Sequence, residues 1–299
     1  MKTKVKGLSF IVAIGFAAWS AEAQAGVYWT DLSAAADVNL GVTELTKNSA
    51  YDSRANAPLG LTSNAVNAAV TGNNQSASAS AAANLAQGAL RASASGSNFG
   101  SAEANASFFD TLQFSVPGAG VSTVTDIGVS LRLDGTTAAS EGPTFTQALL
   151  LSIGGSVDTN SNGGYIYNHE VQATPFPHVS TNDVTFGGWL YKSVSNSGLN
   201  GVDFSGVFGI DGPNPEITIQ EMLTIGAADG ANLNFSDTAA LGLTLPSGVT
   251  YTSASGVFLT EPLSDVPEPS SLTLLGAGVV GLVLLGLQRN FRKNLPRAF

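Results

Sequence analysis

The stretch Ile127–Leu133, with the sequence IGVSLRL, decides the fold class. Its apolar residues alternate with small or charged ones, which is the period-two pattern of a strand with one buried face. Asp134-Gly135 follows and predicts a turn that ends this strand. Leu241, Leu243 and Leu245 repeat the alternation before a Pro-Ser-Gly turn signal. Both segments therefore predict β-structure.

Further segments rich in β-branched, aromatic and aliphatic residues lie between glycine-rich turn signals. They are Phe108–Val116, Ala148–Ile153, Val184–Tyr191, Val202–Ile210, Glu216–Ile225 and Val249–Leu259. Many short strands separated by turn residues are typical of β-sandwiches and jelly rolls. We therefore predict an all-β, sandwich or jelly-roll-like body over residues 26–265.

Composition excludes several classes of site. The chain of 299 residues has no Cys and two His, so it has no disulfides or thiolate metal sites and little material for a histidine-rich zinc centre. Residues 26–265 contain 20 Asp and Glu against five Lys and Arg, a net charge of −15. Because phosphate binding needs clustered basic residues, we predict no nucleic-acid partner.

The first 25 residues have the three parts of an export signal. Three lysines within the first six residues precede an apolar run over 8–19, and Ala23-Gln24-Ala25 forms a small-x-small cleavage site. The apolar run is shorter than the about 20 residues that span a membrane. We predict that signal peptidase cuts after Ala25.

The C-terminal residues 266–299 also have three parts. Pro267, Glu268 and Pro269 precede a run over 270–288 that carries no charge. As a helix, 19 residues reach about 28 Å, close to the hydrocarbon thickness of a bilayer. We therefore predict a transmembrane helix there. The basic tail 289–299 should stay cytoplasmic, and its basic residues are Arg289, Arg292, Lys293 and Arg297.

This arrangement resembles the PEP-CTERM sorting signal of Gram-negative bacteria, in which a Pro-Glu-Pro motif, a short transmembrane helix and an Arg-rich tail follow in that order. The resemblance covers about the last 33 residues and gives no activity to the body. It implies processing by exosortase, a membrane protease-transpeptidase, and a link to extracellular polysaccharide. It also implies a transient inner-membrane anchor and a final location at the outer surface or outside the cell.

Residues 71–107 differ from the rest because Ala, Ser, Gly and Asn dominate them. The composition fits a disordered linker. The strict Ser-Ala alternation over 76–81, repeated over 92–95, instead fits a thin hairpin packed closely on its neighbours. Both alternatives stay open at this point.

The best metal candidate is the loop that starts at Asp158. Asp158, Asn160 and Asn162 place oxygen ligands at alternate positions before a glycine, as calcium loops do. The loop has His169 where such a loop needs a bidentate Glu, and Asx- and Gly-rich turns have the same composition. We expect an ordinary turn, and hence no metal or other cofactor.

Two histidines and an aromatic cluster complete the candidates. His169 and His178 lie in loop-like sequence. His169 beside Glu170 could act as an acid–base pair, but an exposed loop histidine is the expected case.

Six aromatic residues also lie close together in the sequence. If their rings are exposed they would stack on sugars, but large aromatic side chains more often form the core. The cluster comprises Tyr165, Tyr167, Phe176, Phe186, Trp189 and Tyr191.

With no G-x-S-x-G elbow or zinc-protease spacing in the sequence, we expect a non-enzymatic protein of the cell surface or extracellular matrix. One alternative is a glycan-binding module. Another is a glycan hydrolase or lyase on a jelly-roll body, for which two carboxylates would have to meet in the fold.

Overall fold

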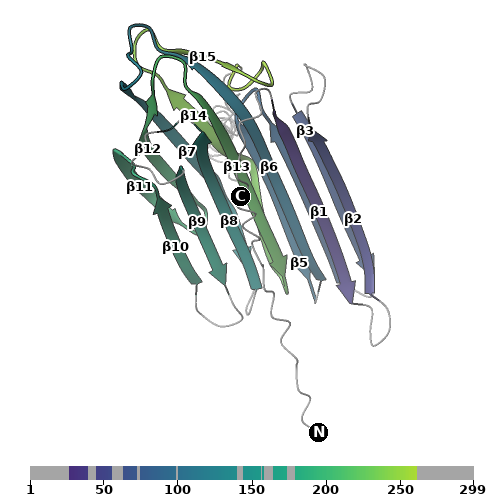
Figure 1. Cartoon of the computed structure of the whole chain (residues 1–299). Coiled ribbons are helices and arrows are strands. Elements are labelled where there is room, and N and C mark those ends of the chain that lie inside the picture. Colours follow the sequence, from purple (N-terminus) through teal and green to yellow (C-terminus); the bar gives the residue numbers. More distant parts are fainter. Residues whose placement is uncertain are drawn as a thin grey trace, which may run out of the picture.

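The computed structural model describes residues 27–39, 45–55, 63–72, 75–98, 100–139, 144–155, 157, 164–173 and 179–260. All named elements in these ranges are β-strands, joined antiparallel into two facing sheets (Figure 1), which confirms the predicted all-β sandwich. Within the described residues, no helix has the length and apolarity that crossing a bilayer requires. The predicted signal peptide and the segment 266–299 lie outside these residues.

Sheet A has seven strands in one path, with β15 added to β6. In spatial order they are β10 (Val179–Phe186), β9 (Tyr165–Ala173), β8 (Thr144–Gly155), β13 (Glu216–Ala228), β6 (Gly100–Ser115), β1 (Trp29–Asn39) and β2 (Leu45–Ala55), and β15 is Thr250–Ser253.

Sheet B has seven strands and lies behind sheet A in Figure 1. In spatial order they are β11 (Tyr191–Gly198), β12 (Gly201–Asp211), β7 (Val124–Ala139), β14 (Ala231–Thr244), β5 (Ala89–Ser97), β4 (Gln75–Asn84) and β3 (Ser63–Gly72).

One half of the sandwich is filled by rings. This aromatic half consists of β8, β9, β10 and β13 facing β7, β11, β12 and β14. The Tyr167 ring stacks on Phe204 with centroids 4.1 Å apart, and Tyr165 lies 5.7 Å from Phe208. Trp189 packs edge-on against both Tyr165 and Phe204 at 5.1 Å. Because each ring buries a large apolar area, these contacts hold the two sheets together across the gap.

The other half is filled by alanines. This alanine half consists of β1, β2 and β6 facing β3, β4 and β5. Cα atoms of β1 come within 8 Å of those of β3 and β4, closer than the usual 10 Å between packed sheets. A Cβ on Gly100 would lie 2.3 Å from the Ser76 carbonyl oxygen. Only small residues fit at that point. The buried alanines of this half, which lie beside a few larger side chains such as Leu32, Val38 and Leu90, are Ala34, Ala36, Ala68, Ala77, Ala79, Ala81, Ala83, Ala89, Ala92, Ala94, Ala102, Ala104 and Ala106.

Strands β4 and β5 form a hairpin within the segment whose order the sequence left open. Its alanines, apart from Ala82, point inward and its serines point outward. The outward hydroxyls pair across the two strands into a serine ladder: Ser76 with Ser97 at 2.8 Å, Ser78 with Ser95 at 2.8 Å and Ser80 with Ser93 at 2.6 Å.

Three local predictions differ from the structure. Asp134-Gly135 is not a turn, because β7 continues to Ala139. The Phe235 ring occupies the space beside Gly135, and a Cβ on that glycine would lie 2.3 Å from the ring. Val184–Tyr191 is not one strand, because residues 187–190 carry the chain from sheet A to sheet B. Of Val249–Leu259, only Thr250–Ser253 is a strand, and turns follow it.

Candidate functional site

Exposed apolar side chains gather where the chain crosses between the sheets. Strand β10 ends sheet A and β11 ends sheet B, and the two share one open side of the sandwich, which we call the β10–β11 edge. The exposed fractions there are 59% for Phe186, 51% for Leu190, 58% for Tyr191 and 37% for Val194. A monomer exposes such side chains singly more often than in a group, so this edge is a candidate binding surface.

Asp183 organises the polar groups of this edge. Its side chain accepts hydrogen bonds from the Tyr167 hydroxyl at 2.7 Å and from the Ser197 hydroxyl at 2.5 Å. The His169 Nδ1 atom lies 3.0 Å from the same carboxylate. Lys192 donates to Thr185 beside it. Ser197 and Lys192 lie on β11, whereas Asp183 and Thr185 lie on β10, so these bonds tie the two sheets together.

The surroundings keep Asp183 ionised. Burial alone would raise the pKa of this carboxyl group, but hydrogen bonds from Ser197, Tyr167 and His169 outweigh that effect and lower it. Burial, together with the hydrogen bond to Asp183 and its charge, raises the pKa of Tyr167 well above its ordinary value. Tyr167 therefore stays a hydrogen-bond donor at neutral pH, and the carboxylate stays an acceptor.

The expected loop position of His169 is wrong. His169 lies in β9 with its side chain fully buried and facing the core. Neighbouring residues in a strand point to opposite faces, so Glu170 faces outward, where it accepts from Gln172 at 2.5 Å. His169 and Glu170 do not form an acid–base pair. His178 lies outside the described residues.

The aromatic cluster divides between core and surface. Tyr165 and Tyr167 are fully buried and Trp189 is half-buried, whereas Phe186 and Tyr191 are exposed. Phe176 lies outside the described residues, as do the calcium candidates Asp158, Asn160 and Asn162. Within the described ranges, no group of three or more His, Asp or Glu side chains is arranged to hold a metal ion.

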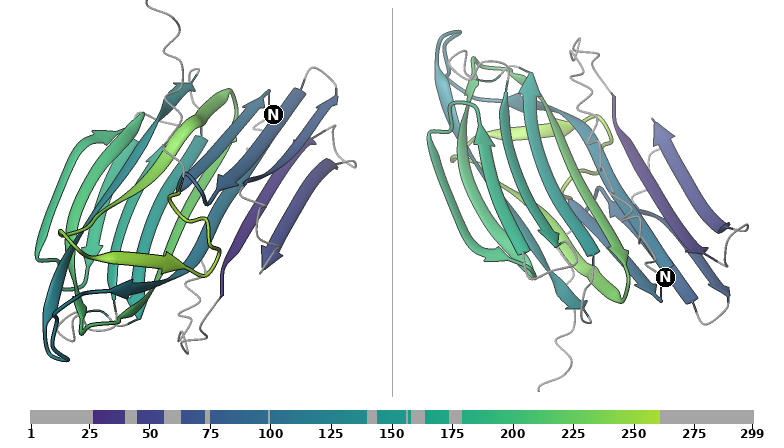
Figure 2. Two further views of the ribbon diagram at one scale, coloured as in Figure 1. Left: turned by 90° about the horizontal axis from the view of Figure 1, so that it is seen from above. Right: turned by 90° about the horizontal axis from the view of Figure 1, so that it is seen from below.

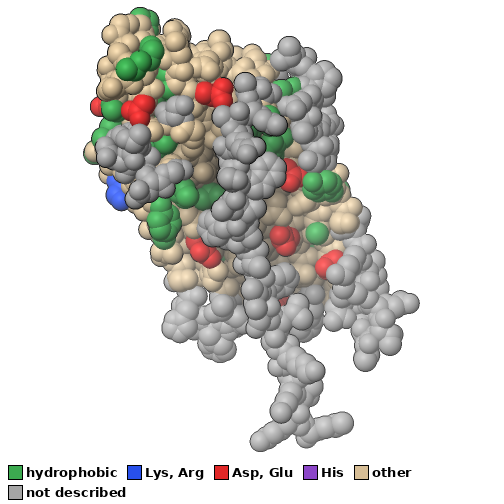
Figure 3. Space-filling view, in the orientation of Figure 1, with side chains coloured by type: hydrophobic (Ala, Val, Ile, Leu, Met, Phe, Trp, Pro, Cys, Tyr) green, Lys and Arg blue, Asp and Glu red, His purple; other side chains and the backbone are tan. Residues whose placement is uncertain are grey.

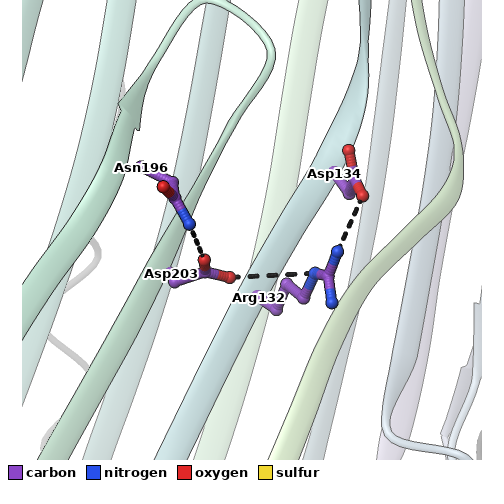
Figure 4. Close-up of polar contacts among 4 residues, drawn as sticks. All are labelled: Arg132, Asp134, Asn196 and Asp203. Carbon is purple, nitrogen blue, oxygen red and sulfur yellow. Dashed lines mark hydrogen bonds and ion pairs between the residues drawn. The ribbon is translucent and has the colours of Figure 1, made fainter.

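A second polar cluster lies on the outer face of sheet B (Figure 4). Arg132 contacts Asp134 at 3.0 Å and Asp203 at 3.7 Å, and Asn196 donates to Asp203. The Arg132 and Asp134 side chains are more than half exposed. Solvent screens such ion pairs, so they contribute little to stability. The two carboxylates flank a guanidinium on an open sheet face and do not face each other.

Two carboxyl groups are buried elsewhere. Asp110 on β6 accepts from the Thr111 amide at 2.8 Å, the Ser255 amide at 3.3 Å and the Ser255 hydroxyl at 2.5 Å. Burial outweighs these bonds and raises its pKa to about 6. Glu221 on β13 is fully buried, and neither carboxyl oxygen has a hydrogen-bond partner in the described part of the chain. Burial raises its pKa well above the usual range.

Sequence reasoning missed the groups around Asp183 and Asp110. The alternation of Tyr165, Tyr167 and His169 was a usable signal, since it places all three side chains on one face of a strand. Nothing in the local sequence connects Asp183 with Ser197, or Asp110 with Ser255. These partners meet only after the sheets have formed.

One comparison identifies the C-terminal segment. Residues 265–290 match the model of the PEP-CTERM protein-sorting motif. The match contains Pro267, Glu268, Pro269 and Arg289, and Arg292, Lys293 and Arg297 follow it. No curated protein matches the chain. The chain therefore carries a PEP-CTERM sorting motif, the mark of an exported protein that is anchored at the membrane and sorted through exosortase.

Proposed function

We propose that this protein is a non-enzymatic component of the cell surface or extracellular matrix that associates with extracellular polysaccharide. Signal peptidase removes residues 1–25, and residues 270–288 hold the chain in the inner membrane until an exosortase-like protease cuts near Pro267–Pro269. The sorting motif supports the route, and the mature protein then reaches the outer surface or the extracellular space.

The β10–β11 edge is the observation that supports a glycan partner. Sugar rings present apolar C–H faces, on which exposed rings such as Phe186 and Tyr191 stack, and hydroxyls, which need polar partners. Ser197 and Lys192 provide polar groups within the same edge. The acidic body favours a neutral glycan, because an anionic one would be repelled.

Binding to polysaccharide from the producing culture tests this function. We expect Tyr191→Ala to weaken binding of the mature protein about tenfold in affinity electrophoresis, as truncation of an aromatic anchor does. Tyr51→Ala is the matched control, because Tyr51 is 69% exposed but lies on β2 at the other side of sheet A. Equal losses for both variants would contradict a site at the β10–β11 edge.

The same incubation tests the non-enzymatic part of the proposal. Hydrolysis of a glycan creates new reducing ends, and a lyase creates unsaturated sugar ends. We expect neither product to accumulate with the mature protein. If either product formed at a rate proportional to protein concentration, the protein would be a glycan hydrolase or lyase and the non-enzymatic proposal would be wrong.

A further inference from the structure

The described chain ends at one particular end of the sandwich. Strand β15 pairs with the last residues of β6, with Thr250 opposite Ser115 and Ser253 opposite Leu112. After β15 the chain runs back along β6, where the Ala254 amide donates to the Thr111 carbonyl at 2.8 Å. It then stays tied to the turn between β4 and β5, because the Leu259 amide donates to the Leu85 carbonyl at 3.1 Å. Figure 2, left, shows β15 at this end, which we call the exit end.

The connection from the exit end to the predicted membrane segment is short. Residues 261–269 separate Thr260 from the uncharged run, and nine residues span at most about 30 Å. Strands β6 and β7 have 16 residues each and are about 50 Å long. A tether shorter than the body keeps its exit end close to the bilayer.

An uncharged loop projects from the same end, on the side of β15 that is farther from Thr260. Residues 116–123 join β6 to β7, and the chain carries no charge over 111–125. Val121 is 86% exposed, the highest value among the large apolar side chains described, and Val124 is 45% exposed. Hydrophobic side chains are visible at the tip of this end in Figure 3, whereas acidic ones are scattered over the sheet face below it.

Backbone hydrogen bonds hold this loop in place. The Gly212 amide donates to the Thr123 carbonyl at 3.0 Å, and the Val116 amide donates to the Pro213 carbonyl at 2.8 Å. Within the loop, the Gly120 amide donates to the Thr123 hydroxyl at 2.9 Å. Val121 is therefore held outward by a braced loop, which is ready to bury it against an apolar partner without ordering cost.

We propose that the exit end faces the membrane and that the loop 116–123 inserts Val121 into the lipid surface while the chain is anchored. This inference rests on the membrane anchor that forms part of the proposed function. The tether raises the effective concentration of lipid at the loop, so a contact too weak to bind alone is made while the tether is intact. Processing at the sorting motif removes that advantage and releases the whole body.

The absence of Cys from the sequence permits a clean test. Val121→Cys in the full chain gives a single thiol, which is labelled with an environment-sensitive NBD dye. The labelled chain is then reconstituted into vesicles of phosphatidylethanolamine and phosphatidylglycerol. Leu199→Cys is the matched control, because Leu199 is also an exposed apolar residue. It lies in the turn between β11 and β12, and the pairing of Gly201 with Asp134 and of Asp211 with Val124 puts that turn at the opposite end.

We expect blue-shifted emission and quenching by spin-labelled lipid at position 121, with neither change at position 199. The proposal would be overturned if the two labels gave the same emission and quenching. It would also be overturned if the emission at position 121 were not shifted in chains that float with the vesicles. Chains that do not float would disprove the anchor and this inference with it. The polysaccharide assay uses the mature form, so its outcome is independent of both.

Discussion

The alanine half and the aromatic half of the sandwich solve the same packing problem at different spacings. In the alanine half the backbones themselves come close, and alanine side chains fill most of the remaining space. In the aromatic half stacked rings such as Tyr167 and Phe204 span the gap. The comparison teaches that one pair of sheets can carry a close, small-residue side and a wide, ring-filled side.

The largest expected effect is in the aromatic half. Phe204→Ala removes a fully buried ring that touches both Tyr167 and Trp189, so we expect a loss of about 3–5 kcal/mol in the free energy of unfolding. Urea titration followed by tryptophan fluorescence measures it. A loss below about 1 kcal/mol would mean that the two sheets are held mainly by the alanine half.

A second effect concerns the buried carboxyl groups. The unfolded chain releases the Asp110 proton near pH 4, whereas the folded chain holds it until about pH 6. Between these values the folded state binds more protons, so stability falls as pH rises and levels off above pH 6. We expect wild type to lose on the order of 3 kcal/mol relative to Asp110→Asn across this window.

Urea titrations of both proteins at several pH values measure this difference. Glu221 is present in both, so its own destabilisation with rising pH cancels. Parallel stability curves for wild type and Asp110→Asn would show that Asp110 carries no pH dependence. The pH dependence of the sandwich would then come from other groups, among them Glu221 and Asp183, whose pKa values the fold also shifts.

The smallest effect compares one substitution in the two halves. Ala104→Leu adds three carbons where β6 faces the close strands β4 and β5, and we expect it to cost about 1–3 kcal/mol. Ala173→Leu is the control in the aromatic half. Ala173 is the last residue of β9, so a larger side chain can extend past the end of the sheet. Equal unfolding midpoints for the two variants would break the distinction between the halves.

Local alternation predicted the parts of the fold that depend on one strand at a time. The segment Ile127–Leu133 lies within β7, with Ile127, Val129, Leu131 and Leu133 all buried. The prediction failed at Gly135, because a turn glycine and a glycine that makes room for a distant ring look the same in sequence. The position of Phe235 decides between them, and it is set by pairing across 100 residues.

The candidate site was less predictable than the fold for the same reason. Phe186 and Tyr191 belong to the aromatic cluster read from the sequence, but composition does not say that the crossing at 187–190 exposes them while Tyr165 and Tyr167 face inward. The hydrogen bonds of Asp183 come from three separate positions on β9 and β11. The sorting motif differs, because it is a linear signal and needs no fold to be recognised.

The serine ladder has a consequence for how this protein meets water. In the Ser78–Ser95 and Ser80–Ser93 pairs the two hydroxyls share one hydrogen bond, which leaves one hydroxyl hydrogen per pair free to point away from the partner. Either serine of a pair can take either role, since only hydrogens need to turn. The outer surface of the hairpin can therefore reverse its pattern of donors and acceptors with every heavy atom in place, and it adapts its hydration to whatever polar material lies against it.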